Sequence, residues 1–159
     1  MSAIQREVIE LVQQQRWAAL ATLHEGEPAV AMVAYAVEPG LEGVLMFLSQ
    51  LAAHTRDLLE HPRCTLAISA QDAGEGDPQL LPRVSLHGTA VPIARDDDQF
   101  ALSGAYYVKR FPSALPRFEL GDFHLLTIDE ARYVGGFARA SSLSGDQLRQ
   151  TAREPHGGA

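Results

Sequence analysis

Hydrophobic and polar positions alternate with two different periods along the chain, and these periods divide it into helices and strands. Residues 2–15 repeat apolar side chains at helical spacing behind Ser2, a favourable helix N-cap. Short apolar or alternating runs that end in glycine- or proline-containing turns predict strands. Gly26 and Pro28 mark the first two of these runs as a hairpin. The runs cover residues 17–24, 29–37, 44–48, 64–70 and 83–93.

Two further segments predict helices. Residues 49–63 leave an apolar strand, follow a helical pattern and stop at Pro62. Residues 94–111 predict a longer helix. We expect its three consecutive aspartates in the first turn, where they suit the helix dipole, rather than in a metal site. Gly88 indicates a bulge or a sharp bend within the strand 83–93.

The pattern as a whole predicts a mainly β, or α+β, fold. Two final strands are expected at residues 123–129 and 131–140, separated at Glu130. We expect residues 1–140 to form a single domain and residues 141–159 to be a polar, loosely held tail. Six to seven strands with three peripheral helices favour an antiparallel split β-barrel, because closure removes exposed sheet edges. The regular strand–helix alternation of doubly wound folds and the glycine-rich phosphate motifs are absent from the sequence.

Composition and charge exclude several classes of function. Hydrophobic residues make up 46% of the chain and charged residues 21%, which is typical of a globular protein. No apolar run approaches the ~20 residues of a membrane helix, and the N-terminal segment lacks a signal-peptide pattern, so we expect no membrane association. A net charge of −7 argues against a nucleic-acid surface. The lone Cys64 cannot form an internal disulfide, which favours a cytoplasmic protein, and its apolar neighbours predict a buried hydrophobe rather than a nucleophile.

The start of the helix in residues 49–63 has the chemistry of an anion site. The first backbone N–H groups of a helix lack partners within the helix, and the helix dipole favours negative charge there. Hydroxyls of Ser49 and Thr55, the imidazole of His54 and the guanidinium of Arg56 add donors at the same place. The alternative is an ordinary connection, in which Ser49 caps the turn and the basic side chains lie on a solvated face.

Four segments in a fixed order extend this hypothesis to most of the chain. They are LATLHEGEPAVAMVAYAV, FLSQLAAHTRDLLEHPRCTLAI, PRVSLHGTAVPI and FHLLTIDEARYVGGFARA. In their order and spacing, residues 17–140 resemble the FMN-binding split barrels related to pyridoxamine 5'-phosphate oxidase, and more closely the haem-utilisation branch of that family. The resemblance implies a homodimer that binds FMN at the subunit interface, with residues 1–140 as the FMN-binding domain.

The resemblance also implies which residues contact the cofactor. The strand–helix junction would hold the phosphate, and the returning strand of the first hairpin would flank the ring and the ribityl chain. An arginine would reach the cofactor from the partner subunit, and the GGF of the closing strand would permit close backbone approach. In this chain the residues of the junction are Ser49, His54, Thr55 and Arg56, and those of the returning strand are Met32, Val33, Ala34 and Tyr35. The arginine is Arg83, and the GGF of the closing strand is Gly135, Gly136 and Phe137.

Departures from the oxidase pattern affect the predicted activity. Ala31, Ala52 and Ala53 stand where the authentic oxidase carries charged or hydroxyl groups, and its C-terminal substrate motif has no match. Oxidation of pyridoxamine phosphate is therefore not expected. Our main hypothesis is an FMN-dependent oxidoreductase that exchanges electrons with a small-molecule substrate or donor, and no residue is assigned a catalytic role.

Two alternatives come from other classes of function. One is a haem-binding or haem-degrading protein on the same fold, in which His156 near the C-terminus would ligate the iron. The other is a non-catalytic split-barrel module that acts through dimerisation and binds its ligand weakly or not at all.

Overall fold

A computed structural model of the chain describes residues 2–154, and its strands form one sheet. The strands are β1 (Trp17–His24), β2 (Glu27–Ala34), β3 (Ala36–Val37), β4 (Val44–Ser49), β5 (Arg63–Ser69), β6 (Arg83–Pro92), β7 (Gly121–Val134) and β8 (Ala140–Ser144). The helices are α1 (Ala3–Gln14), α2 (Ala53–Glu60), α3 (Asp98–Arg110) and α4 (Gly145–Arg153), with short 3-10 helices η1 (Pro39–Leu41), η2 (Pro78–Leu80) and η3 (Pro112–Leu120).

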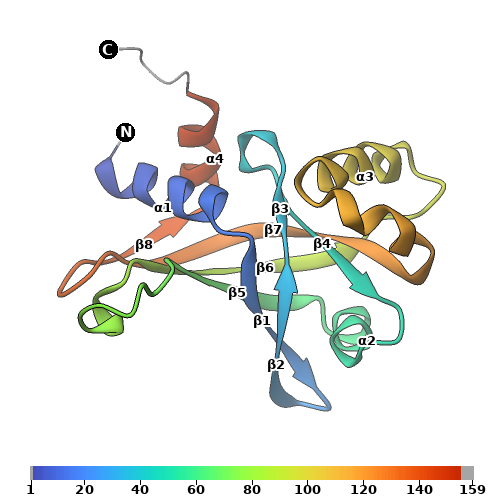
Figure 1. Ribbon diagram of the computed structural model, residues 1–159, viewed down its shortest axis with the longest axis horizontal. Helices are drawn as coiled ribbons and strands as arrows, with labels where there is room; N and C mark the ends of the chain where they lie inside the picture. Colours follow the sequence, from blue (N-terminus) through green and yellow to red (C-terminus); the bar gives the residue numbers. More distant parts are fainter. Residues whose placement is uncertain (1, 155–159) are drawn as a thin grey trace.

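Antiparallel pairing runs through the whole sheet. The strand order is β2-β1-β5-β6-β7-β4-β3, and β8 pairs with β7 outside this path. The sheet curls into a half-barrel, and the turn end of the β1–β2 hairpin projects beyond it (Figure 1), while residues 19–21 of β1 pair with β5. The predicted antiparallel, mainly β fold with peripheral helices is therefore confirmed. Residues 2–154 form eight strands rather than six or seven. The predicted run 29–37 is divided between β2 and β3, the last two predicted strands merge into β7, and β8 lies in the predicted tail.

Two hydrophobic clusters hold the helices to opposite faces of the sheet. The larger cluster fills the curl between α1, α2, α4 and the inward side chains of the strands. The smaller one packs α3 and η3 onto the outer side of β4 and β7, around the fully buried Phe123. Ser2 caps α1 in a reciprocal capping box with Gln5, as the sequence predicted. No helix in residues 2–154 is long and apolar enough to cross a membrane.

The strand 83–93 contains the predicted irregularity at Gly88. The pairing of β6 with β7 shifts register between His87 and Gly88. A Cβ atom built on Gly88 would lie 1.9 Å from the Thr127 carbonyl oxygen. The two backbones can approach this closely only because residue 88 has no side chain.

The predicted break at Glu130 is wrong, because β7 runs without interruption through this residue. Glu130 pairs with His87 on one side and with Ser144 on the other. Its side chain is partly exposed, so a charge at this position does not end the strand. The second predicted strand therefore ends at Val134 and not at Ala140, where β8 begins.

The expected position of the aspartate run also needs correction. α3 begins at Asp98, and Asp97 is its N-cap, whose carboxylate accepts a hydrogen bond of 2.9 Å from the Gln99 backbone nitrogen. Only Asp98 lies in the first turn, while Asp96 precedes the helix. The run therefore starts the helix by capping it as well as by its charge.

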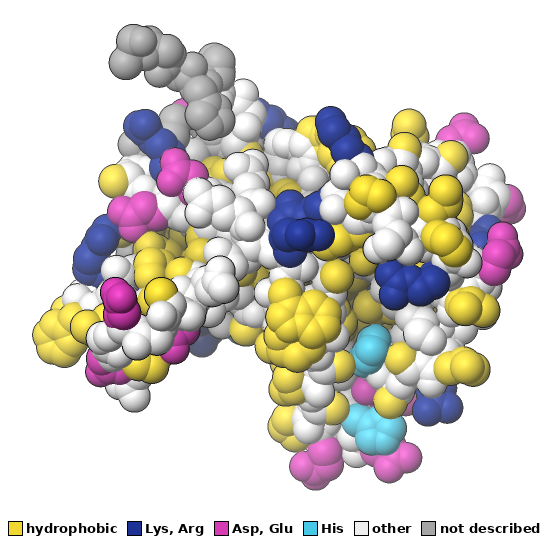
Figure 2. Space-filling model, in the orientation of Figure 1, with side chains coloured by type: hydrophobic (Ala, Val, Ile, Leu, Met, Phe, Trp, Pro, Cys, Tyr) yellow, Lys and Arg dark blue, Asp and Glu magenta, His cyan; other side chains and the backbone are white. Residues whose placement is uncertain are grey.

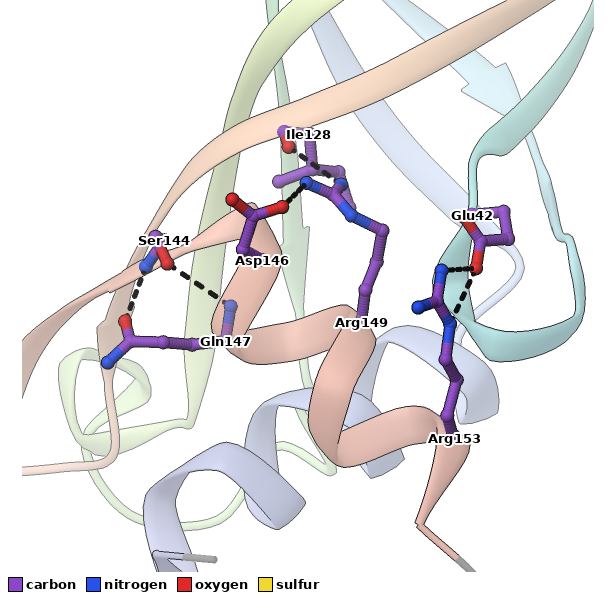
Figure 3. A network of polar contacts seen from close by, with 7 residues as sticks. All are labelled: Glu42, Ile128, Ser144, Asp146, Gln147, Arg149 and Arg153. Atoms are coloured by element: carbon purple, nitrogen blue, oxygen red, sulfur yellow. Dashed lines mark hydrogen bonds and ion pairs between the residues drawn. The ribbon is translucent and has the colours of Figure 1, made fainter.

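Residues 141–153 are not loosely held as predicted, because they form most of β8 and the whole of α4. Figure 3 shows how α4 is anchored: Ser144 and Gln147 form a reciprocal capping box, and Arg149 donates to the Ile128 carbonyl at 3.0 Å. Arg153 donates to Glu42 from the last turn of α4. Leu148 is fully buried in the main core. The sequence pattern missed this because the apolar face of α4 is narrow.

Replacing Leu148 with alanine should lower the free energy of unfolding by about 2–4 kcal/mol, because the truncation leaves a cavity under α4. Gln150→Ala on the exposed side of the same helix is the control and should have little effect. Urea unfolding followed by circular dichroism measures both. Equal stability of the two variants would mean that α4 is not a structural part of the core.

Candidate functional site

Five of the predicted residues meet at one hollow of about 400 Å³, which we call the His54 hollow. It forms where β2 and β4 end and α2 begins, with α3 and η3 closing the other side. Its lining includes Met32, Val33, Ala34, Ser49 and His54 from the prediction. The residues that the sequence analysis missed are Trp17, Phe47, Leu48, Tyr107, Arg117 and Leu120.

Most of the wall of the His54 hollow is apolar or aromatic, and its cationic groups are few. Trp17 and Met32 stand at its edge, where 58% and 48% of their surfaces are exposed. Phe47 and Tyr107 come from the smaller core, with their ring centroids 6.1 Å apart. Arg117 from η3 is the fixed positive charge in the lining. Such a wall suits a largely apolar ligand that carries an anionic group.

His54 contributes an imidazole to this hollow that favours the neutral form. The side chain is half-buried, and burial lowers its pKa from the ordinary value, opposed by the nearby Asp57 carboxylate. A neutral imidazole has a nitrogen lone pair available near pH 7. His54 can therefore accept a hydrogen bond or ligate a metal ion at the wall of the hollow.

The Ser49–Thr55 corner is largely satisfied by the chain itself. Thr55 is buried, and its hydroxyl donates to the Ser49 carbonyl at 2.6 Å. The Ser49 hydroxyl oxygen accepts from the Leu51 backbone nitrogen at 3.2 Å, so Ser49 caps the turn as the alternative interpretation held. Thr55 therefore does not offer its hydroxyl to a ligand. Arg56 is exposed and does not line the hollow.

The first turn of α2 nevertheless retains donors for an anion. Its N-cap is Ala52, which has no side chain to cap the helix, and no side-chain cap is formed there by the described residues. The backbone nitrogen of Ala52 bonds the Ser49 carbonyl, and that of Thr55 bonds Ala52. The N–H groups of residues 53 and 54 lie at the positive end of the helix next to the hollow.

The side chain of Tyr35 lies in the core, so it cannot supply part of a ligand-binding surface, and the predicted contact of this residue could come only from its backbone. Its ring is fully buried, and its hydroxyl donates to the Val12 carbonyl at 2.7 Å. The side chains of alternate residues point to the same face of a strand, and Tyr35 follows the inward-facing Val33. Tyr35 therefore holds the C-terminal end of α1 onto the sheet.

Arg83 lies in a second hollow of about 550 Å³, which we call the arginine hollow. Its walls include Arg132 and the same Trp17 and Met32 that border the His54 hollow. Arg83 donates to the Gln79 and Leu81 carbonyls at 2.6 and 3.2 Å. The two hollows are neighbours on one protomer, but Arg83 does not line the His54 hollow.

No residue of the GGF motif lines either hollow, although Gly135 directly follows Val134, which lines the arginine hollow. Residues 135–139 connect β7 to β8, at the end of the sheet away from α2 (Figure 1). Phe137 is 87% exposed there, and Gly136 has a φ of 122°, which favours glycine. Any contact of this motif with a ligand in the His54 hollow would have to come from another protomer.

Two other candidate residues have different outcomes. Cys64 is buried in the core, and burial raises the pKa of its thiol to about 11, which confirms the interpretation as a buried hydrophobe. His156, the candidate iron ligand, lies outside the residues that the structure describes.

A buried carboxylate that the sequence analysis missed joins α2 to β1. Asp57 is 5% exposed; it accepts from the Thr22 hydroxyl at 3.1 Å and lies 2.7 Å from Nδ1 of His24. We call these three residues the α2 clasp. The sequence carries no signal for it, because 33 residues separate Asp57 from His24 and 35 separate it from Thr22.

The α2 clasp should make stability depend on pH. Hydrogen bonding to His24 lowers the pKa of Asp57, and the same bond raises the pKa of His24. The contribution of Asp57 to the free energy of unfolding is fully present above its unfolded pKa of 3.8, and it is lost as the pH falls through the lowered pKa of the folded state. The contribution of His24 is fully present below its unfolded pKa of 6.5, and it is lost as the pH rises through the raised pKa of the folded state. The difference in melting temperature between the wild type and Asp57→Asn should therefore be largest between pH 3.8 and 6.5. A difference independent of pH would exclude the ion pair.

The outer face of the β1–β2 hairpin is entirely apolar. Four cross-strand pairs form it, and Trp17, Leu23, Val30 and Met32 are its exposed large side chains. In Figure 2 this face is a column of hydrophobic side chains, and histidine side chains lie beside it. The pairs, in register order, are Trp17–Ala34, Ala19–Met32, Ala21–Val30 and Leu23–Pro28. An exposed apolar patch of this kind marks an interaction surface.

Comparisons with known proteins agree with this architecture. The non-canonical haem oxygenase HOZ of Arabidopsis thaliana, a chloroplastic protein, is 37% identical over 125 residues. These residues are 77% of this chain but 36% of that protein, so the chain spans little more than a third of it. A haem-binding protein from Mycobacterium smegmatis has a TM-score of 0.84 at 27% identity, over 96% of this chain and 65% of its own.

More distant structures share the fold. HutZ, a haem storage protein from Vibrio cholerae, has a TM-score of 0.69 at 20% identity, over 77% of this chain and 88% of that chain. At this identity the likeness concerns the fold alone. The model of the pyridoxamine 5'-phosphate oxidase family matches residues 4–135, which include every strand except β8. The chain therefore belongs to the pyridoxamine 5'-phosphate oxidase family.

Proposed function

We propose that the protein binds haem in the His54 hollow. The observation that carries this proposal is the chemistry of the lining, in which apolar and aromatic side chains surround one imidazole that favours the neutral form and one guanidinium. Haem needs an apolar slot for the porphyrin, a nitrogen ligand for the iron and cations for its propionates. Two relatives above 25% identity are named for haem chemistry, which supports this choice over FMN.

The residues of the hollow have distinct roles in this proposal. His54 would hold the iron through its lone pair, and Arg117 would pair with a propionate. Trp17, Met32 and Phe47 would contact the porphyrin and exclude water from it. Bound haem would supply the redox centre. Oxidoreductase activity stays a prediction of the sequence.

A second copy of the chain completes the site in this proposal. The apolar outer face of the β1–β2 hairpin borders both hollows through Trp17 and Met32. Packing two such faces together would bury them and would bring the arginine hollow of one protomer towards the His54 hollow of its partner. Arg83 would then act from the partner subunit. The resulting homodimer has the isologous symmetry that most dimers adopt.

FMN is the second candidate ligand, and one observation favours it. The first turn of α2 lacks a side-chain cap from the described residues and lies beside Ser49, so its N–H groups can receive a phosphate. Against this, the Thr55 hydroxyl is engaged with Ser49, and Arg56 does not line the hollow. A phosphate at this corner would have fewer donors than the sequence predicted.

Titration of the purified 159-residue chain with haemin tests the proposal. We expect a saturable Soret band, and His54→Ala should weaken haemin binding at least roughly tenfold and shift the band. His61→Ala is the control, because His61 is an exposed histidine at the end of the same helix.

Two further arms identify the ligand and the iron contact. His156→Ala measures the alternative iron ligand; if it abolishes the spectrum while His54→Ala keeps it, the assignment of His54 is wrong. FMN binding is followed by flavin fluorescence. Saturable FMN binding without a defined haemin spectrum would overturn the haem proposal and favour the flavin.

A further inference from the structure

The α2 clasp lies next to the His54 hollow but does not line it. Its carboxylate, Asp57, comes from α2, and both partners come from β1. His24 contacts Asp57 through Nδ1 while its side chain is 50% exposed. A buried carboxylate with two donors is well satisfied, but the same carboxylate with one donor removed carries an uncompensated charge. The clasp is therefore a specific attachment and not an incidental surface contact.

Besides the clasp, helix α2 is attached to the sheet through two other buried side chains, and it contacts β2 and β6 as well as β1. Leu58 is buried in the core, and Thr55 bonds the Ser49 carbonyl at the start of the helix. Leu59 on the same helix is 62% exposed and does not contribute to the packing. Because α2 is only eight residues long, it would not be stable without such contacts.

We propose that Asp57 is a positioning residue for the His54 hollow. His54 and Asp57 are three residues apart, so they lie about one helical turn from each other on neighbouring parts of the helix surface. The clasp fixes α2 against β1, and this fixes the place of His54 on the wall of the hollow. The inference rests on the proposed function, since its first readout is haemin affinity.

Variants of His24 give the cleanest test, because His24 does not line the hollow and its removal leaves α2 unchanged in sequence. His24→Ala should weaken haemin binding roughly 10- to 100-fold, the range found when a group that orients a metal ligand is lost. His24→Gln keeps an N–H that can donate to Asp57 and should restore most of the affinity. His61→Ala should bind haemin as the wild type does.

Amide hydrogen exchange of α2 tests the positioning role separately from the proposed haem binding, because the measurement needs no ligand. In His24→Ala the amides of residues 56–60 should exchange faster than in the wild type, and in His24→Gln they should be protected again. Wild-type exchange rates in His24→Ala would refute the positioning role even if haemin binds. Faster exchange with unchanged haemin affinity would refute it too, because the clasp would then be only structural. If the wild type gives no haemin spectrum, the proposed function is refuted. The exchange rates alone then decide whether the clasp holds α2 in place.

Discussion

Val30→Asp should prevent formation of the proposed dimer. Val30 is 69% exposed at the centre of the apolar outer face of the hairpin, opposite Ala21, and it lines neither hollow. If this face packs against a second copy, an aspartate there buries an unpaired charge, which costs about 3 kcal/mol or more and weakens association at least roughly a hundredfold. Size-exclusion chromatography with light scattering measures the molar mass.

The same variant links dimerisation to ligand binding. In the proposed dimer the partner completes the site, so Val30→Asp should also weaken haemin binding although the residue is outside the hollow. Leu102→Asp on α3 is the matched control, since Leu102 is similarly exposed at 62% and lies outside the hairpin face. A wild type that is monomeric at tens of micromolar, or a Val30→Asp variant that stays dimeric, would contradict the proposed assembly.

Gly88→Ala should destabilise the fold by about 3 kcal/mol or more. The added methyl group would lie 1.9 Å from the Thr127 carbonyl oxygen and 2.9 Å from its carbon, and both are backbone atoms that cannot rotate away. This clash can be relieved only if β6 and β7 move apart, and these two strands have the longest paired stretch in the sheet. Urea unfolding followed by circular dichroism measures the loss.

Gly104→Ala is the matched control for this prediction. Gly104 lies within α3, and a Cβ there would meet the Phe118 ring at an ordinary contact distance of 3.5 Å. Alanine favours a helix interior over glycine by about 0.5–1 kcal/mol, so this variant should be as stable as the wild type or slightly more stable. Similar losses for both variants would mean that close approach at the bulge is not the cause.

The candidate site could be predicted only in part, and the reason is geometric. His54 and Ser49 were found because a strand that turns into a helix has a local chemical signature. Thr55 has the same signature, but whether its hydroxyl faces a ligand or the Ser49 carbonyl depends on the turn between them. Trp17 and Arg117 are one hundred positions apart in the chain, and no local pattern connects them.

Within the fold, the sequence by itself determined the elements whose signals are local. Periodicity and turn residues predicted the opening hairpin and the strands that follow it, Ser2 predicted the start of α1, and Gly88 predicted the bulge. These features depend on backbone conformations and capping contacts within a few residues, so they can be read from neighbouring positions.

Only the tertiary structure decided which of these elements meet and what each side chain contacts. In the folded chain the side chain of Tyr35 lies in the core, and α4 packs onto the sheet through Leu148. Asp57 contacts His24, which is 33 residues away in the sequence. The tertiary structure also brought the two hollows to either side of Trp17 and Met32. The physical reason is that burial and long-range hydrogen bonds depend on how the sheet curls, and the curl is a property of all the strands together.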